Sequence, residues 1–327
     1  MIASRISEPS TLVRADTAVW QVIPNTGELE TKDEKLREQN SRLPDFFICG
    51  AAKSGTTSLF NYLGQHSSIF TPEQKEPGYF SALRPLESPY RYGQLFKEAG
   101  EHQYTGEASG AYLTSPDSAL RISKAVPQAK IIIMLRNPAD RAFSLYQWMI
   151  EEGYEWAPTF KDALRMEEDR RNSVSFVKEN PEYFYNFLYR TSGCYARQVE
   201  RFLETFDWEQ VRFLIFDDFV SSPASCTRKI FRFLGIDDTI KLNTPVRNEG
   251  RNVHSAPLQF WLRQRAKPIL RKIPLGLRIM RKAMQWNTTP RKGTLSDRFR
   301  RRLLQYYEED IRETSALIGR NLASRWL

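Results

Sequence analysis

Cysteine, histidine and long apolar runs are scarce in this chain. Only three cysteines, Cys49, Cys194 and Cys226, occur in 327 residues, and so few and so dispersed a set excludes a disulfide framework. Three histidines are present, and no His/Cys/Asp cluster has the spacing of metal ligands, so we expect no metal. No run approaches the roughly 20 apolar residues that span a bilayer, and the N-terminus lacks a leader pattern. We therefore expect no transmembrane segment and a cytoplasmic protein.

Positive charge, in contrast, is in excess. The 48 Lys and Arg residues outnumber the 39 Asp and Glu residues, which gives a net charge of +9. Such a surplus favours an anionic ligand, an anionic acceptor or an acidic membrane surface. Basic residues gather in the C-terminal third, from Arg263 to Lys282 and from Arg298 to Arg302. No zinc-finger, basic-zipper or RNP pattern accompanies them, so we expect no nucleic-acid partner.

The pattern of the chain changes at about residue 44. Residues 1–43 are polar and weakly patterned, which predicts an N-terminal extension, and residues 44–327 are expected to form a single domain. Expected strands lie at 45–51, 130–136 and 212–216. Expected helices lie at 56–65, 116–126, 138–152, 158–171, 190–206, 223–234, 256–283 and 295–320, and 66–110 is rich in loops. Strands that alternate with helices predict an α/β fold, with a central parallel sheet covered by helices on both faces.

The first strand leads into a loop that can hold an anion. Gly50 and Gly55 bound this loop, and an amphipathic helix follows it. Free N–H groups at a helix start attract anions. The glycines have the spacing of the G-x-x-x-x-G-K-[ST] loop, but Thr56 stands where that pattern has lysine, and the loop's own lysine is Lys53. This arrangement favours a short anionic tail over a triphosphate, and the alternative is an ordinary Gly/Ser turn.

A second candidate element follows the strand at 130–136. Arg136 stands at the end of a continuously apolar run, Asn137-Pro138 follows it, and Ser144 lies on the next expected helix. Arginine supplies a forked, permanently charged donor set, which suits a phosphate. The alternatives are an ion pair of Arg136 with Asp140 at the helix start and a Ser144 that faces solvent.

Together these segments resemble the sulfotransferases that use 3′-phosphoadenosine 5′-phosphosulfate (PAPS). The loop that runs Lys53, Ser54, Gly55, Thr56, Thr57, Ser58 resembles the family's 5′-phosphosulfate loop. Arg136 and Ser144 match the family's R-x7-S element, which holds the 3′-phosphate. The resemblance extends from about residue 44 to the end of the chain. It implies a P-loop-like, nucleotide-kinase-like sulfotransferase fold, PAPS as the sulfuryl donor, and a reaction that needs no metal.

The resemblance also points to a general base. The segment Lys75-Glu76-Pro77-Gly78-Tyr79-Phe80 resembles the K-E-x-x-[FY]-F segment of carbohydrate sulfotransferases of the heparan sulfate type. In that group the glutamate deprotonates the acceptor, so the resemblance implies Glu76 as the base and Lys75 as a nearby charge. A positioned carboxylate contributes roughly 10²–10⁴-fold to such a reaction. The alternative is a solvated Lys–Glu pair on a loop.

Two further residues, His102 and Glu107, are candidates for contact with the acceptor and stay open as alternatives to Glu76 for the base. Estrogen-type relatives use histidine as the base, and His102 lies before the segment that begins at Glu107. Glu107 heads a stretch that resembles the family's E-K-[ST]-x-x-Y segment, but Ala108 replaces its lysine. Because that lysine helps some relatives to bind sulfated glycans, its loss puts a heparan-type acceptor in doubt.

Weaker matches concern the cofactor. Phe216 falls where some relatives have an aromatic ring near the adenine, although a buried strand residue is an equal reading. Gly250 and Arg251 resemble the family's late loop that closes over the 3′-phosphate.

The function predicted from the sequence is transfer of a sulfuryl group from PAPS to a hydroxyl or amine. The acceptor is a carbohydrate, a lipid or a small natural product. Two other classes stay open: a P-loop kinase, and a non-catalytic binder of anionic glycans or lipids that uses the basic C-terminal helices.

Overall fold

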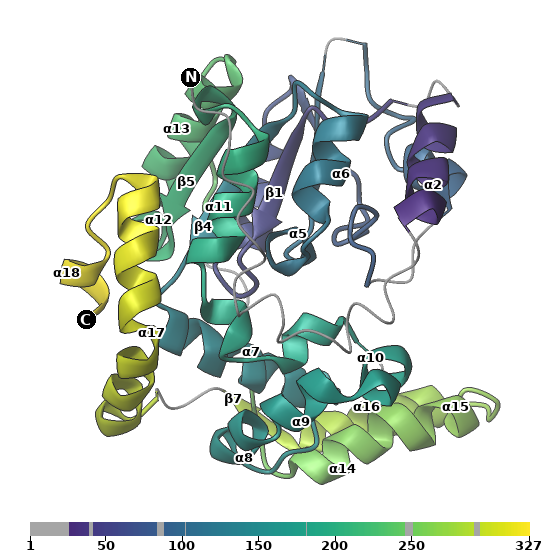
Figure 1. The fold of residues 1–327 in the computed structure, drawn as a ribbon. Coiled ribbons are helices and arrows are strands. Elements are labelled where there is room, and N and C mark those ends of the chain that lie inside the picture. Colours follow the sequence, from purple (N-terminus) through teal and green to yellow (C-terminus); the bar gives the residue numbers. More distant parts are fainter. Residues whose placement is uncertain are drawn as a thin grey trace.

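A parallel β-sheet forms the centre of the molecule (Figure 1). The computed structural model describes residues 26–38, 42–83, 88–101, 103–180, 182–245, 251–290 and 295–327. Within them, five strands lie in the order β2-β3-β1-β4-β5, and every pairing is parallel. Their bounds are β1 (Phe46–Gly50), β2 (Ile69–Phe70), β3 (Tyr104–Ala108), β4 (Lys130–Leu135) and β5 (Val211–Ile215). The predicted central parallel sheet is confirmed.

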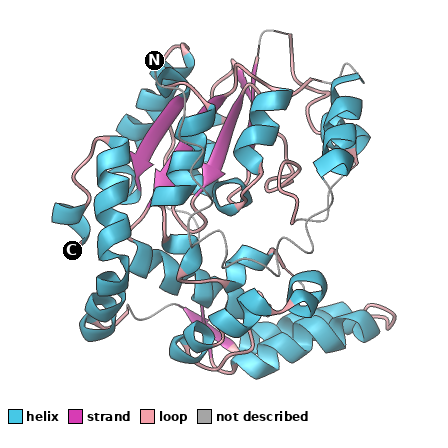
Figure 2. Cartoon of the chain, in the orientation of Figure 1, coloured by secondary structure: helices cyan, strands magenta, loops and turns pink. Residues whose placement is uncertain are grey.

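Helices cover both faces of this sheet, as Figure 2 shows. Alternate residues of a strand point to opposite faces. Phe46 and Ile48 of β1 therefore pack with α3 (Thr56–Leu63) and α13 (Pro223–Leu234), whereas Phe47 packs in the larger core on the other face. That larger core includes residues of α6 (Ser118–Ala125), α7 (Pro138–Glu151), α11 (Ala196–Thr205) and α17 (Asp297–Ile318). The predicted helical layers are confirmed.

The remaining elements are short and mostly helical. They are α2 (Thr26–Glu38), α4 (Pro89–Gln94), α5 (Ala111–Thr114), α8 (Phe160–Arg165), α9 (Glu167–Asn172), α10 (Val174–Glu179), η2 (Phe184–Phe187), η3 (Thr191–Gly193), η4 (Trp208–Gln210), α12 (Phe216–Ser221), β6 (Arg251–Val253), α14 (Ala256–Trp261), η5 (Leu262–Ala266), α15 (Lys267–Leu270), α16 (Gly276–Trp286), β7 (Thr288–Pro290) and α18 (Ala323–Trp326). No helix among the described residues is both long and apolar enough to cross a bilayer.

Strand β3 lies inside the stretch that the sequence pattern presents as loop. Its register sets Gly106 opposite Phe46 of β1. A Cβ on Gly106 would lie 2.1 Å from the ring of Phe46, so only glycine fits there. The strand therefore carries a glycine and a buried carboxylate, Glu107, in place of the apolar run that marks β1 and β4. Tertiary packing, which a local pattern does not contain, makes this segment a strand.

Helix α2 belongs to the segment expected to be an N-terminal extension, and it packs into the main core. Leu36 is fully buried in the larger cluster. Asp33 accepts two hydrogen bonds from the guanidinium of Arg121 on α6, at 2.8 and 2.9 Å, and both side chains are buried. The hydroxyl of Tyr79 donates to the carbonyl of Lys32. This helix is therefore joined to the loop that carries Lys75 and Glu76.

The expected helix at 256–283 is wrong as a single element. The chain forms α14, a turn of π-helix at η5 and α15, then reverses through residues 271–275 and continues as α16. Pro268 and Pro274 explain the interruptions, because proline has no N–H to donate within a helix. The expected last helix at 295–320 is confirmed as α17.

Candidate active site

The connection between β1 and α3 forms the expected anion loop. Gly55 stands at the start of α3 with φ of 89°, a left-handed conformation that glycine adopts without steric cost. Lys53 also has a positive φ, of 66°. Beyond this turn, the first N–H groups of α3 have no carbonyl of their own helix to bind, as at any helix start. The strand–loop–helix order predicted from the sequence is confirmed.

A cavity of about 810 Å³ lies at the carboxyl ends of the strands. Its walls follow β1, β3, β4 and β5, and parallel strands bring these ends to one edge of the sheet. Most of the predicted site residues line it: Lys53, Gly55, Thr56, Thr57, Ser58, Lys75, Glu76, Arg136, Ser144 and Phe216. Ser54 of the same loop is fully buried and does not line the cavity, and its hydroxyl has no hydrogen-bond partner among the described residues.

Arg136 joins the two elements that the sequence singles out. Its guanidinium donates to the carbonyl of Lys53 at 2.9 Å and stacks over the ring of Phe216, 4.4 Å from the ring centroid. Asp140, the alternative partner, pairs with Arg300 of α17 at 3.0 Å. The side-chain oxygen of Asn137 caps α7 instead. Arg136 is thereby held against the loop, facing the cavity.

Glu76 also lines the cavity, and it has an unusual backbone conformation. Its φ is 60°, a strained region for a residue with a Cβ, which costs of order 1 kcal/mol or more. Two hydrogen bonds hold it there: its N–H donates to the carbonyl of Ala108 at 3.0 Å, and the N–H of Gly110 donates to its carboxylate at 2.7 Å. Lys75 pairs with the other carboxylate oxygen. The carboxylate is thus fixed to the end of β3 and is more constrained than a solvated loop pair.

Helix α7 contributes a line of residues to the same cavity. The ammonium of Lys53 lies 5.3 Å from the ring centroid of Trp148, a cation–π distance. Ser144, Trp148 and Glu151 follow one another at helical spacing and therefore share a face. Lys53 is held between its loop and this helix.

Comparison with known proteins identifies the family. A model of the sulfotransferase domain matches residues 43–249, more than half of the chain. The chain belongs to the sulfotransferase family. The predicted membership is confirmed.

Curated relatives match the same part of the chain. The bifunctional heparan sulfate N-deacetylase/N-sulfotransferase 1 of Caenorhabditis briggsae is 26% identical over 204 residues, 60% of this chain and 23% of that protein. The human enzyme 2 of that name is 28% identical over 205 residues, 60% of this chain and 22% of the relative. The matched region is therefore less than a quarter of each of these relatives.

A solved structure supports the fold. The sulfotransferase from Alicyclobacillus acidocaldarius superposes with a TM-score of 0.66 at 30% identity, covering 87% of this chain and 99% of that one. The expected sulfotransferase fold is confirmed.

The sulfotransferase cavity also contains residues that the sequence analysis did not assign to the site. Besides Trp148 and Glu151, they are Ala52, Tyr62, Gly110, Ala111, Leu145, Glu152, Glu182, Tyr183, Asn186, Phe219, Val220, Pro223 and Thr244. The helical spacing from Ser144 could have indicated Trp148 and Glu151. The residues around η2 carry no local signal, because only the tertiary fold brings them to the cavity.

Glu107 lies below the cavity and does not line it. It is fully buried, and its carboxylate accepts hydrogen bonds from the hydroxyls of Tyr92, Tyr112 and Ser109 at 2.6, 3.0 and 2.6 Å. Burial raises the pKa of Glu107 to about 7, although these three donors act in the opposite direction. Ser109 also accepts from the N–H of Gly78 at 3.0 Å. Glu107 therefore supports the loop that holds Glu76.

The three remaining candidates from the sequence analysis are His102, Gly250 and Arg251. His102 and Gly250 lie outside the described residues. Arg251 begins β6 with an exposed side chain that does not line the cavity, and its N–H donates to Glu151 at 3.1 Å.

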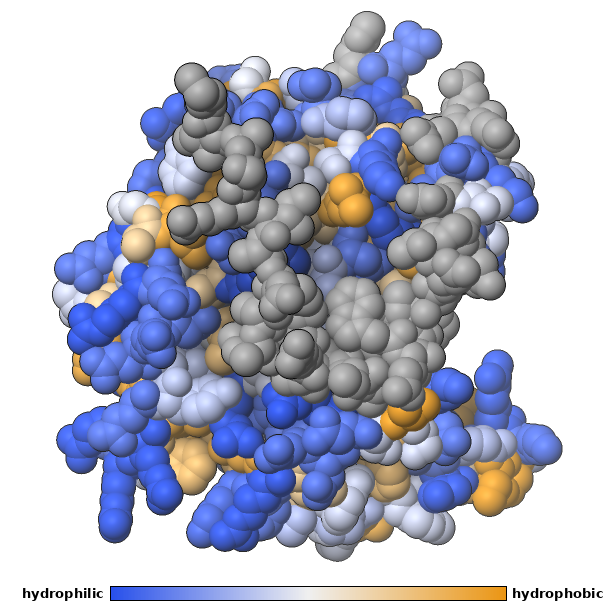
Figure 3. Space-filling view, in the orientation of Figure 1, coloured by the Kyte–Doolittle hydropathy of each residue, from blue (hydrophilic) through white to orange (hydrophobic). Residues whose placement is uncertain are grey.

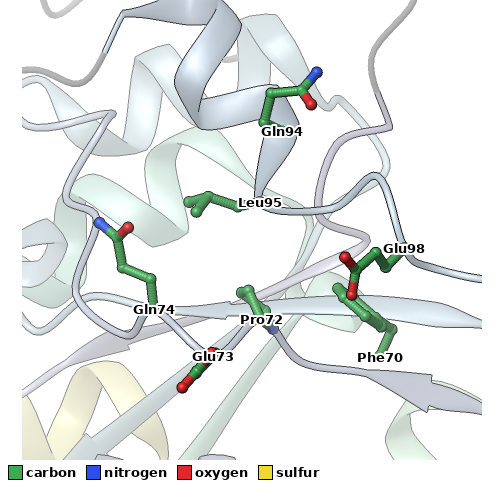
Figure 4. Close-up of a pocket in the computed structure, with 7 residues that line it drawn as sticks. All are labelled: Phe70, Pro72, Glu73, Gln74, Gln94, Leu95 and Glu98. Carbon is green, nitrogen blue, oxygen red and sulfur yellow. The ribbon is translucent and has the colours of Figure 1, made fainter.

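A second hollow of about 460 Å³ lies between the loop after β2 and the end of α4 (Figure 4). Its wall carries two carboxylates, Glu73 and Glu98, and two amides, Gln74 and Gln94, with Phe70, Pro72 and Leu95. Without a cation in its wall, it is a poor place for an anionic cofactor.

We predict that Glu107 makes folding stability depend on pH. The pKa of Glu107 is about 7 in the folded protein, against an ordinary value of 4.5, so the folded state keeps a proton that the unfolded state loses. Its contribution, about 3 kcal/mol, should be complete below pH 4.5 and be lost as the pH rises through 7. In Glu107→Gln, the unfolding free energy measured by urea titration should therefore depend less on pH between 4.5 and about 7.

The pKa of Asp310 is also raised by burial, to about 6, and contributes in the same direction in both proteins. The difference between parent and variant therefore isolates Glu107. The exposed Glu98→Gln is the matched control, and its unfolding free energy should change with pH as that of the parent does. If the unfolding free energies of the parent and of Glu107→Gln changed equally with pH, the raised pKa of Glu107 would be contradicted.

Proposed function

We propose that this protein transfers a sulfuryl group from PAPS to an acceptor hydroxyl or amine. The observation that most supports this function is the shared cavity: Lys53 and the start of α3, Arg136 with Ser144, and the carboxylate of Glu76 all line it. Two cationic groups and a helix start suit a donor with two anionic ends, and the carboxylate suits removal of a proton.

The donor is proposed to bind between the anion loop and α7. Lys53, the hydroxyls of Thr56 to Ser58 and the N–H groups at the start of α3 would hold the 5′-phosphosulfate. Arg136 and Ser144 would hold the 3′-phosphate. The ring of Phe216, already stacked on Arg136, would lie against the adenine.

Glu76 is proposed to act as the base. It takes the proton from the acceptor, the acceptor oxygen or nitrogen forms a bond to sulfur, and the bond from sulfur to the bridging phosphate oxygen breaks. Lys53 and the loop N–H groups stabilise the negative charge that develops on that oxygen, so 3′,5′-adenosine bisphosphate leaves. Positioning of Glu76 by Gly110 and Lys75 keeps its carboxylate oriented before the acceptor arrives.

The charges along the rest of the cavity favour a neutral or amine-bearing acceptor. Glu151, Glu152 and Glu182 line it beside Trp148, and Ala108 stands where some relatives have a glycan-binding lysine. Arg263 lies 3.4 Å from Glu152 and compensates only part of this charge. A polyanionic glycan would be repelled by such a wall, whereas an amine would be attracted. An amine is also the group that the name of the N-sulfotransferase relatives implies.

Calorimetric titration with 3′,5′-adenosine bisphosphate tests the cofactor. The parent should bind it in preference to ATP with magnesium. Arg136→Ala should weaken binding by roughly 10- to 100-fold, because a charge-assisted phosphate contact is lost. Arg301→Ala, on the exposed surface of α17, is the control. A preference for ATP would contradict PAPS as the donor and would favour the P-loop kinase hypothesis instead.

Glu76→Gln tests the base. The variant keeps its size and loses its proton-accepting charge, so turnover with PAPS should fall by about 10²–10⁴-fold while the bisphosphate binds as tightly as before. Glu73→Gln, three residues earlier on the same loop, should retain parent turnover. A Glu76→Gln enzyme as fast as the parent would exclude Glu76 as the base.

An acceptor series tests the charge of the wall. Matched aryl compounds that carry an amine, a hydroxyl or an additional sulfonate should differ in kcat/KM, with the sulfonate the poorest. Glu182→Gln should narrow the difference between amine and sulfonate by about tenfold, because a neighbouring carboxylate is removed. A sulfonated acceptor that is preferred by the parent would contradict this assignment.

A further inference from the structure

The segment from α14 to α16, residues 256–286, carries positive charge without any acidic residue. We call it the C-terminal hairpin, because α14, η5 and α15 run into a turn at 271–275 and α16 returns. Its basic residues are Arg263, Arg265, Lys267, Arg271, Lys272, Arg278, Arg281 and Lys282. In Figure 1 it forms one end of the molecule, below α7. The positive charge of the C-terminal hairpin therefore favours a negatively charged partner.

The same hairpin exposes large hydrophobic side chains. They make up nearly half of all such residues in the described parts of the chain: Leu258, Trp261, Ile269, Ile273, Leu275, Ile279 and Trp286. Trp286 is 80% exposed and Leu275 is 68% exposed. Figure 3 shows hydrophobic side chains among hydrophilic ones at the end of the hairpin near α15. Apolar residues gathered in this way mark an interaction site.

Helix α16 is apolar on two faces. Met280 is buried against Leu262 and Ala266 of the other arm, so one face is the hairpin's own core. Ile279 and Trp286 are seven residues apart and therefore lie on a common face that solvent reaches. A surface helix needs only one apolar face. The second face of α16 is thus without a partner in the described structure.

The turn of the hairpin also combines exposed basic side chains with exposed apolar ones. All five residues from 271 to 275 are exposed, and they combine Arg271 and Lys272 with Ile273 and Leu275. Leu275 has φ of 61°, a conformation in which a leucine is strained. Neither the backbone nor the core of the hairpin requires a large apolar side chain at this exposed position. An external apolar environment would account for it.

We propose that the C-terminal hairpin docks on an anionic lipid bilayer. Ile273, Leu275, Ile279 and Trp286 would enter the boundary between headgroups and acyl chains. The neighbouring Lys and Arg side chains would pair with lipid phosphates and carboxylates.

Charge and apolar exposure together favour lipid over the other occupants. A sulfated glycan would engage the basic residues alone and would leave the exposed Ile and Trp side chains in water. A second copy of this hairpin would bring two basic surfaces without acids into contact, which like-charge repulsion opposes. Of these three occupants, the anionic bilayer is the one that supplies both negative charge and an apolar layer.

Docking would bring the sulfotransferase cavity to the membrane surface. The amide of Gln259 in α14 donates to the carbonyl of Glu151 at 2.9 Å, and Glu151 lines the cavity. A Cβ on Gly153 would lie 2.7 Å from that of Arg263, so the hairpin and the end of α7 are in close contact. A surface-bound hairpin therefore fixes the distance of the cavity from the lipid.

Vesicle flotation of the full chain tests the proposal. The parent should float with phosphatidylcholine vesicles that contain about 30% phosphatidylserine, with a partition coefficient at least about tenfold higher than for pure phosphatidylcholine, and salt should weaken it. Replacement of both Ile279 and Trp286 by serine keeps every charge and should lower partitioning by about tenfold or more. The exposed Trp208→Ser, on η4, is the matched control and should behave as the parent. Thermal melting would verify that each variant is folded.

Three results would overturn the proposal. The first is a parent that does not float with anionic vesicles. The second is a parent and an Ile279/Trp286 variant that bind vesicles equally, which would leave a purely electrostatic surface of the kind that heparin also binds. The third is a dimer, seen by light scattering without lipid, that the double variant abolishes. None of these readouts depends on sulfuryl transfer, so failure of the lipid proposal leaves the proposed reaction standing, and the reverse also holds.

Discussion

The common direction of the strands is the constraint on which this structure depends. Because β1, β3, β4 and β5 are parallel, the segments that follow them all emerge at one edge of the sheet. Lys53 follows β1, Gly110 follows β3, Arg136 follows β4 and Phe216 follows β5. The first and the last of these residues are more than 160 positions apart in the chain, yet all four line one cavity. Reversal of any of these strands would send its functional residue to the opposite edge.

Side chains of both charges line that cavity. Lys53 and Arg136 lie on the side of the anion loop, each against an aromatic ring. Carboxylates from the end of α7 and from the segment before η2 line it as well, and Glu76 stands between Lys75 and the N–H of Gly110. The cations suit a donor with anionic ends, and the carboxylates suit an uncharged or amine-bearing acceptor.

The hydrogen bonds that hold the loop of Glu76 extend well below the cavity. Gly110 orients Glu76, Ser109 binds both Glu107 and the N–H of Gly78, and Tyr79 contacts the backbone of α2. Helix α2 is thus coupled to the loop that carries Lys75 and Glu76 through a buried hydrogen-bond network. Such networks are costly when any member lacks a partner, so they favour one arrangement of the loop.

The amino-acid sequence by itself determined the elements that local pattern encodes. The apolar runs of β1, β4 and β5 identified the core strands, and the Gly50 to Gly55 spacing identified the loop between β1 and α3. The pattern after β4 identified Arg136 and Ser144 as residues that line the cavity. Each of these signals is a short stretch with its own periodicity or turn chemistry. The tertiary structure alone decided the rest. It made a strand of the glycine- and glutamate-bearing segment at β3, since the ring of Phe46 excludes a side chain at Gly106. In the folded chain, Glu107 is also buried and α2 packs in the core. One expected helix forms a hairpin, and Glu182 lines the cavity. Each of these outcomes depends on contacts between residues far apart in the chain, which no local pattern records.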